Sequence, residues 1–254
     1  MTDAALHAEW IVPAWSVPSR VRALMTTRDG GVSTDRWSGS SGGGMNLGLG
    51  SGDDVDVVVR NRVILARHLP SEPAWLKQVH GTRVVEATRW PTEPEADASF
   101  TEEPGRVCAI LVADCMPVLF TDRQGTRVAA AHAGWRGLVG GILEATLAAS
   151  GLVPADTLAW IGPAIGPARF EVGDDVREAF IAKGGADVRA CFVPHAAGKW
   201  LADLPALARL SLAASGVREI VSSACCTATD DRRFYSYRRD GVTGRMAAVI
   251  WITH

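Results

Sequence analysis

The sequence predicts a single α/β domain with four layers, α/β/β/α, in which two mixed sheets pack together between outer helices. Strand-like and helix-like patterns recur in both halves of the chain. Two of the strand-like runs, residues 107–113 and 127–131, consist almost entirely of β-branched or small apolar residues, as in strands covered on both faces. Two packed sheets with helices outside them would bury all of these runs. We therefore treat residues 1–254 as one domain, with residues 1–19 as an irregular lead-in.

Composition excludes several classes of function. The chain has 254 residues, 47% of them hydrophobic, and a formal net charge of −2. A packed core is readily formed, and the charge gives no general attraction to nucleic acid or to an anionic membrane. No apolar run reaches the 18 residues of a membrane span, and the N-terminus lacks the apolar stretch of a signal peptide, so a cytoplasmic location is expected. Five cysteines without framework spacing favour reduced thiols.

The first half of the chain offers one clear strand and one clear helix. A strand is predicted around 21–26, with a sharp turn at Gly30 and Gly31 after it. A helix follows at 55–69, capped by Asp53 or Asp54. Strands are then expected on both sides of 78–81, and the polar, proline-rich stretch 88–106 reads as a loop that frames the site.

The second half repeats the alternation of strands and helices. A helix is expected over 137–150, with Gly151 ending it. Further helices are predicted with Asp174 as an N-cap and with Asp203 ahead of Leu204. Strands are predicted at 219–223 and at 246–252. Both halves thus supply elements to the same layered fold.

Metal-binding residue types stand where the two buried runs end. The first run leads into Asp114 and Cys115, and the second into His132. Adjacent strands lie about 4.8 Å apart, so neighbouring strands would bring the thiol and the imidazole close together. His80, in the turn 78–81, would complete a His/Cys/His set. Such ligands suit zinc, with copper as the alternative metal, and three of them leave a fourth position open.

The residues near this predicted metal site also have simpler structural interpretations. A lone histidine in a turn is commonly a surface residue, and no HExxH or CxxC spacing supports the set. Asp114 is placed to orient a ligand or to shuttle a proton, and it could equally cap a strand end. Asp97 is either a cap or an acid that supports a metal ligand.

Two stretches could bind an anion. Residues 38–54 are rich in glycine, but they have no phosphate-loop spacing, so a mobile surface loop is the better local interpretation. Asn46 is one of the few large side chains within it, and Arg28 precedes the Gly30 turn, where it either points into a cleft or is solvated. In 225–245, aromatic residues alternate with arginines, which suits either a solvated loop or a pocket wall for a ring and a phosphate.

The assembled blocks resemble one family. They run from about residue 20 to the C-terminus and include TTRDGGVS, MNLG, LKQVHG, ADASFT, ADCMPVLF, AAAHAGWRG, IGPAIGP, FEVGDDV and RFYSYRRDGVTGR. The chain is identified as a member of the YfiH-type family, which has been called laccase-domain or polyphenol oxidoreductase, purine nucleoside phosphorylase, and peptidoglycan editing factor. QVHG, ADCMP and HAGWRG in that order are its most specific motifs.

The resemblance implies a fold, a metal and an activity. The fold would be related to the catalytic domain of cytotoxic necrotizing factor, and the zinc ligands map onto His80, Cys115 and His132. The implied reaction is phosphorolysis of adenosine, inosine and methylthioadenosine, with some adenosine deamination, so a nucleoside and phosphate are the expected partners. The chain departs from the family at SGSSGGG, before Met45, which leaves the shape of one pocket rim open.

Roles for individual residues follow as hypotheses. Cys115 and Asp114 are the predicted catalytic residues, although a thiolate that binds zinc is a poor free nucleophile. The predicted substrate-binding residues are Arg28, Asn46, Gln78 and Arg245, with Arg28 or Arg245 holding phosphate. Three alternatives remain: an amidase that edits peptidoglycan precursors, a copper polyphenol oxidoreductase, and a protein with structural zinc whose fourth ligand is His195 or Cys226. The oligomeric state is not predicted.

Overall fold

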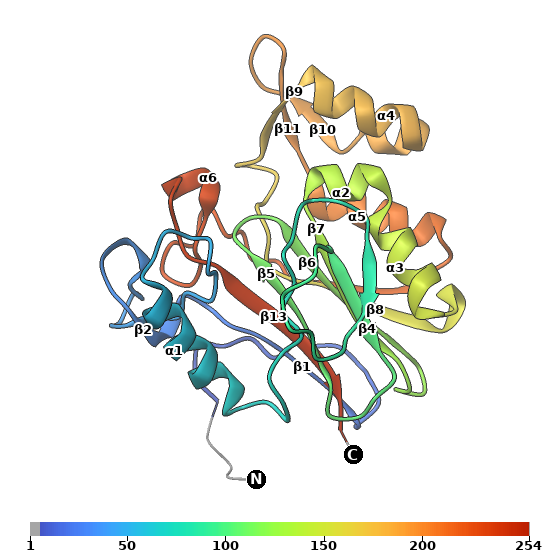
Figure 1. Cartoon of the computed structure of the whole chain (residues 1–254). Coiled ribbons are helices and arrows are strands. Elements are labelled where there is room, and N and C mark those ends of the chain that lie inside the picture. The colour runs from blue at the N-terminus through green and yellow to red at the C-terminus, as the bar shows by residue number, and fades with distance from the viewer. Residues whose placement is uncertain (1–5, 254) are drawn as a thin grey trace.

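The computed structural model describes residues 6–253, with the backbone alone at 185 and 186, and shows two packed sheets between helices (Figure 1). The smaller sheet is antiparallel, in the order β1 (Val21–Met25), β13 (Met246–Ile252), β5 (Val107–Val112). The larger sheet has six strands in the order β12 (Glu219–Ser222), β8 (Thr157–Ile161), β6 (Met116–Asp122), β7 (Val128–Ala133), β4 (Ala98–Thr101), β3 (Val84–Glu86). It is mixed, because its two outer pairs are parallel and its inner pairs antiparallel.

Helices cover the outer faces of both sheets. Helix α1 (Val55–Ala66) lies against the smaller sheet, and α3 (Ile142–Ser150) and α5 (Leu204–Ala214) lie on the larger one (Figure 1). A third small sheet, β10 (Phe192–Pro194), β11 (Lys199–Ala202), β9 (Glu171–Gly173), packs with α4 (Asp174–Arg189). The remaining elements are β2 (Asp29–Ser33), α2 (Trp135–Gly140), α6 (Tyr237–Asp240) and two short 3₁₀ helices, Asp35–Trp37 and Pro154–Asp156.

Three apolar cores separate these four layers, and β13 shows how. Its residues alternate between two of them: Met246, Ala248 and Ile250 face the larger sheet, whereas Ala247 and Val249 face the α1 side. Side chains of a strand alternate between the two faces of its sheet, so an all-apolar run serves two cores at once. The predicted four-layer α/β/β/α architecture is confirmed. None of the helices in residues 6–253 is long and apolar enough to cross a bilayer.

Most predicted elements form near their expected positions. The strands at 21–26, 219–223 and 246–252 and the helices after Asp54 and Asp203 are all present. Asp54 caps α1 by accepting hydrogen bonds from the N–H groups of Asp56 and Val57, and Asp203 caps α5 through the N–H of Ala206. At α4 the N-cap is Gly173, and Asp174 is the first helical residue.

Other local predictions are wrong. The expected turn at Gly30 and Gly31 lies inside β2, and Gly30 has φ +101° there. The predicted helix 137–150 is divided at Gly141, which has φ +98° and starts a second helix. The loop predicted at 88–106 contains β4, and before 78–81 the chain makes only isolated bridges at Ala74 and Lys77 in place of a strand.

Candidate metal centre and cavity

Cys115 and His132 are brought together by the pairing of β6 with β7. Cys115 directly precedes β6, and Pro117 lies opposite His132. Leu119 and Ala130 belong to the core between the two sheets, so the alternation of a strand places Cys115 and His132 on that same face. The structure brings the two predicted residues together, but the predicted route was wrong: β5, which ends before Cys115, belongs to the other sheet and does not pair with β7.

Asp97 holds both histidines in place. Its carboxylate accepts hydrogen bonds from the backbone N–H groups of Val79, His80 and Gly81 at 3.2, 2.9 and 2.7 Å. It also contacts Nδ1 of His132 at 2.8 Å, which leaves Nε2 of that ring free to bind a metal. These contacts fix the turn in which His80 has φ +61°. Asp97 thus caps the turn 79–81 and also holds His132, a predicted metal ligand.

The three ligand side chains have a geometry that suits a small cation. Cys115 Sγ lies 3.7 Å from His80 Nε2, and one ligand atom from each of His80, Cys115 and His132 lies within 4.8 Å of the others. Bonds of about 2.1 Å to nitrogen and 2.3 Å to sulfur around a tetrahedral ion would separate the two atoms by about 3.6 Å. The residues therefore fit zinc, and no fourth protein ligand belongs to this group among the described residues.

The thiol and the imidazole also suit each other electrostatically. Burial raises the pKa of Cys115, but the charge of His132 and hydrogen bonds from His132 and His80 outweigh it and lower the pKa to about 6. Burial lowers the pKa of His132, whereas the charge of Cys115 and the bond to Asp97 raise it to about 9. The site therefore favours a thiolate, which is the form that binds a metal.

The triad opens into a cavity of about 650 Å³. Its lining includes aromatic residues, namely Trp135, Phe170 and Tyr237. The basic residues of the lining are Arg62, Lys77, Arg136, Arg238 and Arg245, and the acidic ones are Glu93 and Asp114. A cavity of this size, with aromatic faces, several cations and a metal-binding group, suits a ligand that combines a ring with an anion.

Arg245 is the cation best placed for an anion within this cavity. Its Nη1 donates to the carbonyls of Thr243 and Gly244 at 2.8 and 3.0 Å. Among the described residues no carboxylate forms an ion pair with it, and burial lowers the pKa of its guanidinium. A half-buried cation without an acidic partner favours binding an anion from solution.

Asp114 lines the cavity, but its carboxylate already has several donors. It accepts hydrogen bonds from Thr227 Oγ1 at 2.6 Å, Ser236 Oγ at 3.0 Å and the N–H of Arg238 at 2.7 Å. Its backbone has φ +88°, at the point where the chain passes from one sheet to the other. Asp114 thus connects the loop before Cys115 to helix α6, and its predicted catalytic role stays a prediction.

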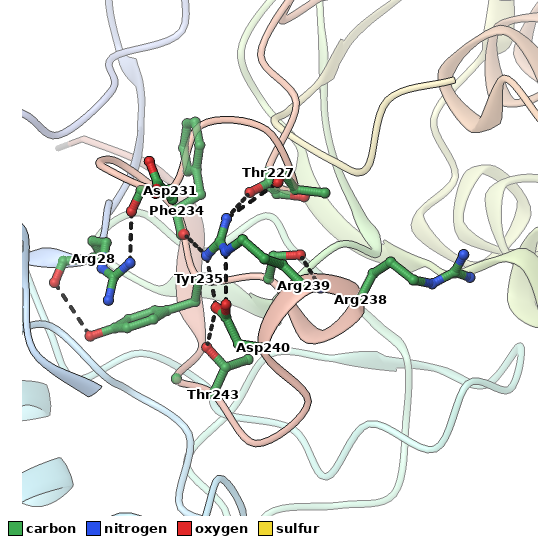
Figure 2. A network of polar contacts seen from close by, with 12 residues as sticks. Arg28, Thr227, Asp231, Phe234, Tyr235, Arg238, Arg239, Asp240 and Thr243 are labelled. Atoms are coloured by element: carbon green, nitrogen blue, oxygen red, sulfur yellow. Dashed lines mark hydrogen bonds and ion pairs between the residues drawn. The ribbon is translucent and has the colours of Figure 1, made fainter. Parts of the chain in front are cut away.

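Figure 2 shows how the segment around α6 is held together. Arg239 donates to the carbonyls of Thr227 and Phe234 at 2.9 Å each and pairs with Asp240 at 2.7 Å. Arg238 points away from this network, and its guanidinium carbon lies 5.4 Å from the ring centre of Phe170. The arginines predicted as one anion cluster therefore divide into structural and cavity-lining residues.

Two of the predicted substrate-binding residues, Arg28 and Asn46, lie outside the cavity lining and form hydrogen bonds there. Arg28 donates to the carbonyls of Ser38 and Asp231 (Figure 2) and does not line the cavity. Asn46 is fully buried, where its amide binds Ser51 and Asp53 and accepts from the N–H of Arg245. Both have structural roles here in place of the predicted substrate contact.

Gln78 lines the cavity, but its amide makes two hydrogen bonds to the backbone of Leu111, at 2.7 and 2.8 Å. The two candidates for a fourth zinc ligand lie outside the triad. His195 pairs with Glu171 at 3.5 Å, and Cys226 accepts from the N–H of Gly166 at 3.1 Å. Residues 48–51 line the cavity, whereas the SGSSGGG insertion does not.

Sequence reasoning missed two features of the site. Gly134 leaves room for the triad, because a Cβ there would lie 2.8 Å from Cys115 Sγ and 3.0 Å from His80. Arg62 and Glu93 form an ion pair at 2.6 Å in the cavity wall. The only sequence signal for Gly134 is its place between His132 and a helix, and Glu93 lies in a stretch with no regular pattern.

Three side chains that could hold a metal ion, facing a cavity with several basic residues, define a candidate enzyme site. The chain belongs to the family described as multi-copper polyphenol oxidoreductase laccase, whose family model matches residues 22–253. It is 49% identical to a Pseudomonas aeruginosa protein and 50% identical to Escherichia coli YfiH, both named purine nucleoside phosphorylase. These matches cover 96% and 95% of this chain and 98% of each relative.

Solved structures agree with the sequence matches. A Neisseria meningitidis protein has a TM-score of 0.91 at 44% identity, over 97% of this chain and all of that one. YlmD from Geobacillus stearothermophilus has a TM-score of 0.85 at 32% identity, over 93% of each chain. The family assignment made from motifs is thereby confirmed, together with the fold.

Proposed function

We propose that this chain is a zinc-dependent purine nucleoside phosphorylase acting on adenosine, inosine and methylthioadenosine, with adenosine deaminase activity as a side reaction. The observation that carries the proposal is the open His80, Cys115 and His132 set in a cavity that also contains Arg245. The names of the Pseudomonas and Escherichia relatives support the same reaction class. The ligands proposed are a purine nucleoside and inorganic phosphate.

Phosphorolysis requires two kinds of electrostatic help. Breaking the N-glycosidic bond leaves negative charge on the purine and positive charge on the ribose, while phosphate must be held beside the anomeric carbon. Arg245 would hold the phosphate, because it is a half-buried cation without an ion-pair partner among the described residues. The aromatic lining, Trp135, Phe170 and Tyr237, would hold the purine.

Zinc, when bound by the triad, would supply a Lewis acid at the purine end of the cavity. Asp97 would keep His132 in the tautomer that presents Nε2 to the metal. Cys115 would act as a ligand in the thiolate form, so we do not assign it a second role as a covalent nucleophile. Asp114 would act by holding α6, and with it Tyr237 and Arg238, at the cavity wall.

The direct test is to incubate the purified, zinc-loaded protein with inosine, with and without phosphate, and to measure hypoxanthine. We expect release that depends on phosphate. Arg245→Lys should raise the KM for phosphate at least about tenfold, because a lysine lacks the fixed planar donors of arginine. Release at the same rate without phosphate, or no release at all, would contradict the proposal. Conversion of adenosine to inosine without phosphate tests the side reaction.

The family description favours a second candidate, a copper polyphenol oxidoreductase. Two histidines and a cysteine can also bind copper. The His80, Cys115 and His132 group is the one metal-binding cluster of at least three residues found within residues 6–253, and it offers a single metal position. Multi-copper oxidation uses several coppers, so we rank this activity second. Oxygen consumption with a phenol and a copper-loaded sample would test it.

A further inference from the structure

The cavity has two ends of different chemistry. At one end, Trp135 follows Gly134, which packs on Cys115 and His80, and Tyr237 lies in α6, whose first turn is bonded to Asp114 and whose Arg238 packs on Phe170. At the other end, Arg62 of α1 bonds to the carbonyl of Leu47, beside residues 48–51, and pairs with Glu93, and none of these lining residues is aromatic. Arg245 joins the two ends, since it packs on Gly48 and is close enough to Cys115 and Tyr237 for their charges to affect it.

Glu93 is an unexpected residue in a cavity that would bind phosphate. Of the two carboxylates in the described lining, Asp114 is saturated by donors from the α6 segment. Glu93 uses one oxygen, Oε1, to pair with Arg62, and its Oε2 has no hydrogen-bond partner in the described part of the chain. Its side chain is 32% exposed. A carboxylate here would repel a phosphate, so its natural ligand is a neutral group that donates hydrogen bonds.

Arg62 makes Glu93 a rigid acceptor. Only 10% of the Arg62 side chain is exposed, its Nε donates to the carbonyl of Leu47 at 3.0 Å, and its guanidinium lies 4.3 Å from the ring centre of Trp75. The guanidinium is therefore held by two other contacts before it meets Glu93. An acceptor fixed in this way loses little conformational freedom when it binds a ligand.

From this arrangement we propose that Glu93, held by Arg62, is the subsite for the vicinal hydroxyl groups of the substrate ribose. The inference rests on the proposed function, because a purine at the aromatic, metal end and a phosphate at Arg245 leave the sugar to face Glu93. A carboxylate can accept hydrogen bonds from both the 2′- and 3′-hydroxyl groups. The subsite selects ribonucleosides over deoxyribonucleosides, because a deoxyribose leaves part of the carboxylate without a donor.

The test compares inosine, 2′-deoxyinosine and 3′-deoxyinosine as substrates, each with phosphate, for the wild type, Glu93→Gln and Glu93→Ala. We expect the wild type to prefer inosine in kcat/KM, and both variants to lose at least about tenfold of that preference. The ratio of kcat/KM for inosine to that for each deoxyinosine is compared between wild type and variant. The difference in intrinsic reactivity of the glycosidic bonds is the same in both proteins and therefore cancels. Glu102→Gln is the matched control, since Glu102 pairs with Arg127 and neither residue lines the cavity.

Each outcome has a separate meaning. Active variants with an unchanged preference for inosine would overturn the Glu93 subsite and leave the phosphorylase proposal intact. A wild type that cleaves none of the three nucleosides would overturn the phosphorylase proposal and the subsite with it. A change in preference that also appears in Glu102→Gln would show a general effect of charge and would overturn the specific role of Glu93.

Discussion

At the scale of single residues, the metal site depends on one position where no side chain fits. Gly134 has φ −70° and ψ 165°, which any residue can adopt, so the reason for glycine is steric. An added Cβ would meet both Cys115 Sγ and His80. The site therefore requires glycine at position 134 as well as its three ligands, because any larger side chain would collide with two of them.

We predict that Gly134→Ala keeps the fold but weakens zinc binding at least about tenfold, because the thiolate and the imidazole must move apart from their bonding geometry. Zinc affinity measured by competition with a chelator, together with circular dichroism, checks this. Gly50→Ala is the control, since no heavy atom lies within 4 Å of a Cβ at that position. Equal zinc affinity in wild type and Gly134→Ala would contradict the steric explanation.

Away from the cavity, a single residue, Asp29, holds the glycine-rich segment in place. Its carboxylate is buried and accepts hydrogen bonds from Ser40 Oγ at 2.7 Å and from the N–H and Oγ of Ser41 at 3.0 Å each. Burial raises the pKa of Asp29, but these hydrogen bonds outweigh burial and lower it. The glycine-rich insertion is thus closed by one ionised side chain.

Asp29→Asn should lower the free energy of unfolding by about 1 to 3 kcal/mol at pH 7. Because the folded pKa lies below the unfolded value of about 3.9, the stabilisation is present above that pH and is lost as pH falls through the folded pKa. The difference between wild type and variant should therefore shrink in acid, as urea titrations at several pH values would show. The control is Asp35→Asn, on the exposed 3₁₀ helix. A difference independent of pH would refute the role of the charge.

At the scale of elements, α6 is a four-residue helix that needs outside support. Asp114 accepts a hydrogen bond from the N–H of Arg238 in its first turn, and Arg239 of the helix binds the carbonyls of Thr227 and Phe234 in the segment that precedes it (Figure 2). Helices this short are not stable alone. The position of Tyr237 and Arg238 at the cavity wall is thus set by hydrogen bonds from other elements.

Removing Arg239 should therefore affect substrate binding more than metal binding. In Arg239→Ala the carbonyls of Thr227 and Phe234 lose their donors, which should cost about 1 to 3 kcal/mol of stability and raise the KM for the nucleoside severalfold. Zinc content should stay at the wild-type level. Arg232→Ala, at an exposed position in the same segment, should change neither quantity. Loss of zinc in Arg239→Ala would show that the segment also supports the triad.

At the scale of the whole molecule, continuous apolar runs and the recurrence of strand and helix patterns were enough to predict four layers, because a strand buried on both faces must lie between two cores. The register of the site was beyond such reasoning. No strand was predicted at 116–122, yet β6 forms there and supplies the pairing with β7. The turn at Asp114, which moves the chain between sheets, has no sequence signal beyond a polar residue.

The same limits explain why Arg28 and Asn46 were predicted to bind substrate. Arg28 and Asn46 stand beside glycines, a context that suits ligand binding and also suits the satisfaction of loop backbone groups. Here the second use applies, because both side chains hydrogen-bond within the loop region. His80, Cys115 and His132 were found because their residue types carry chemistry that few structural roles require.

The central claim is that these three side chains hold one metal ion, and zinc binding by Cys115→Ser tests it most directly. Wild type should contain about one zinc per chain, and excess zinc should raise its Tm by about 5 to 10 °C relative to the metal-free protein. Cys115→Ser should fold yet show neither effect, whereas Cys225→Ser should behave as wild type. Equal zinc content and an equal rise in Tm for Cys115→Ser and wild type would contradict the claim.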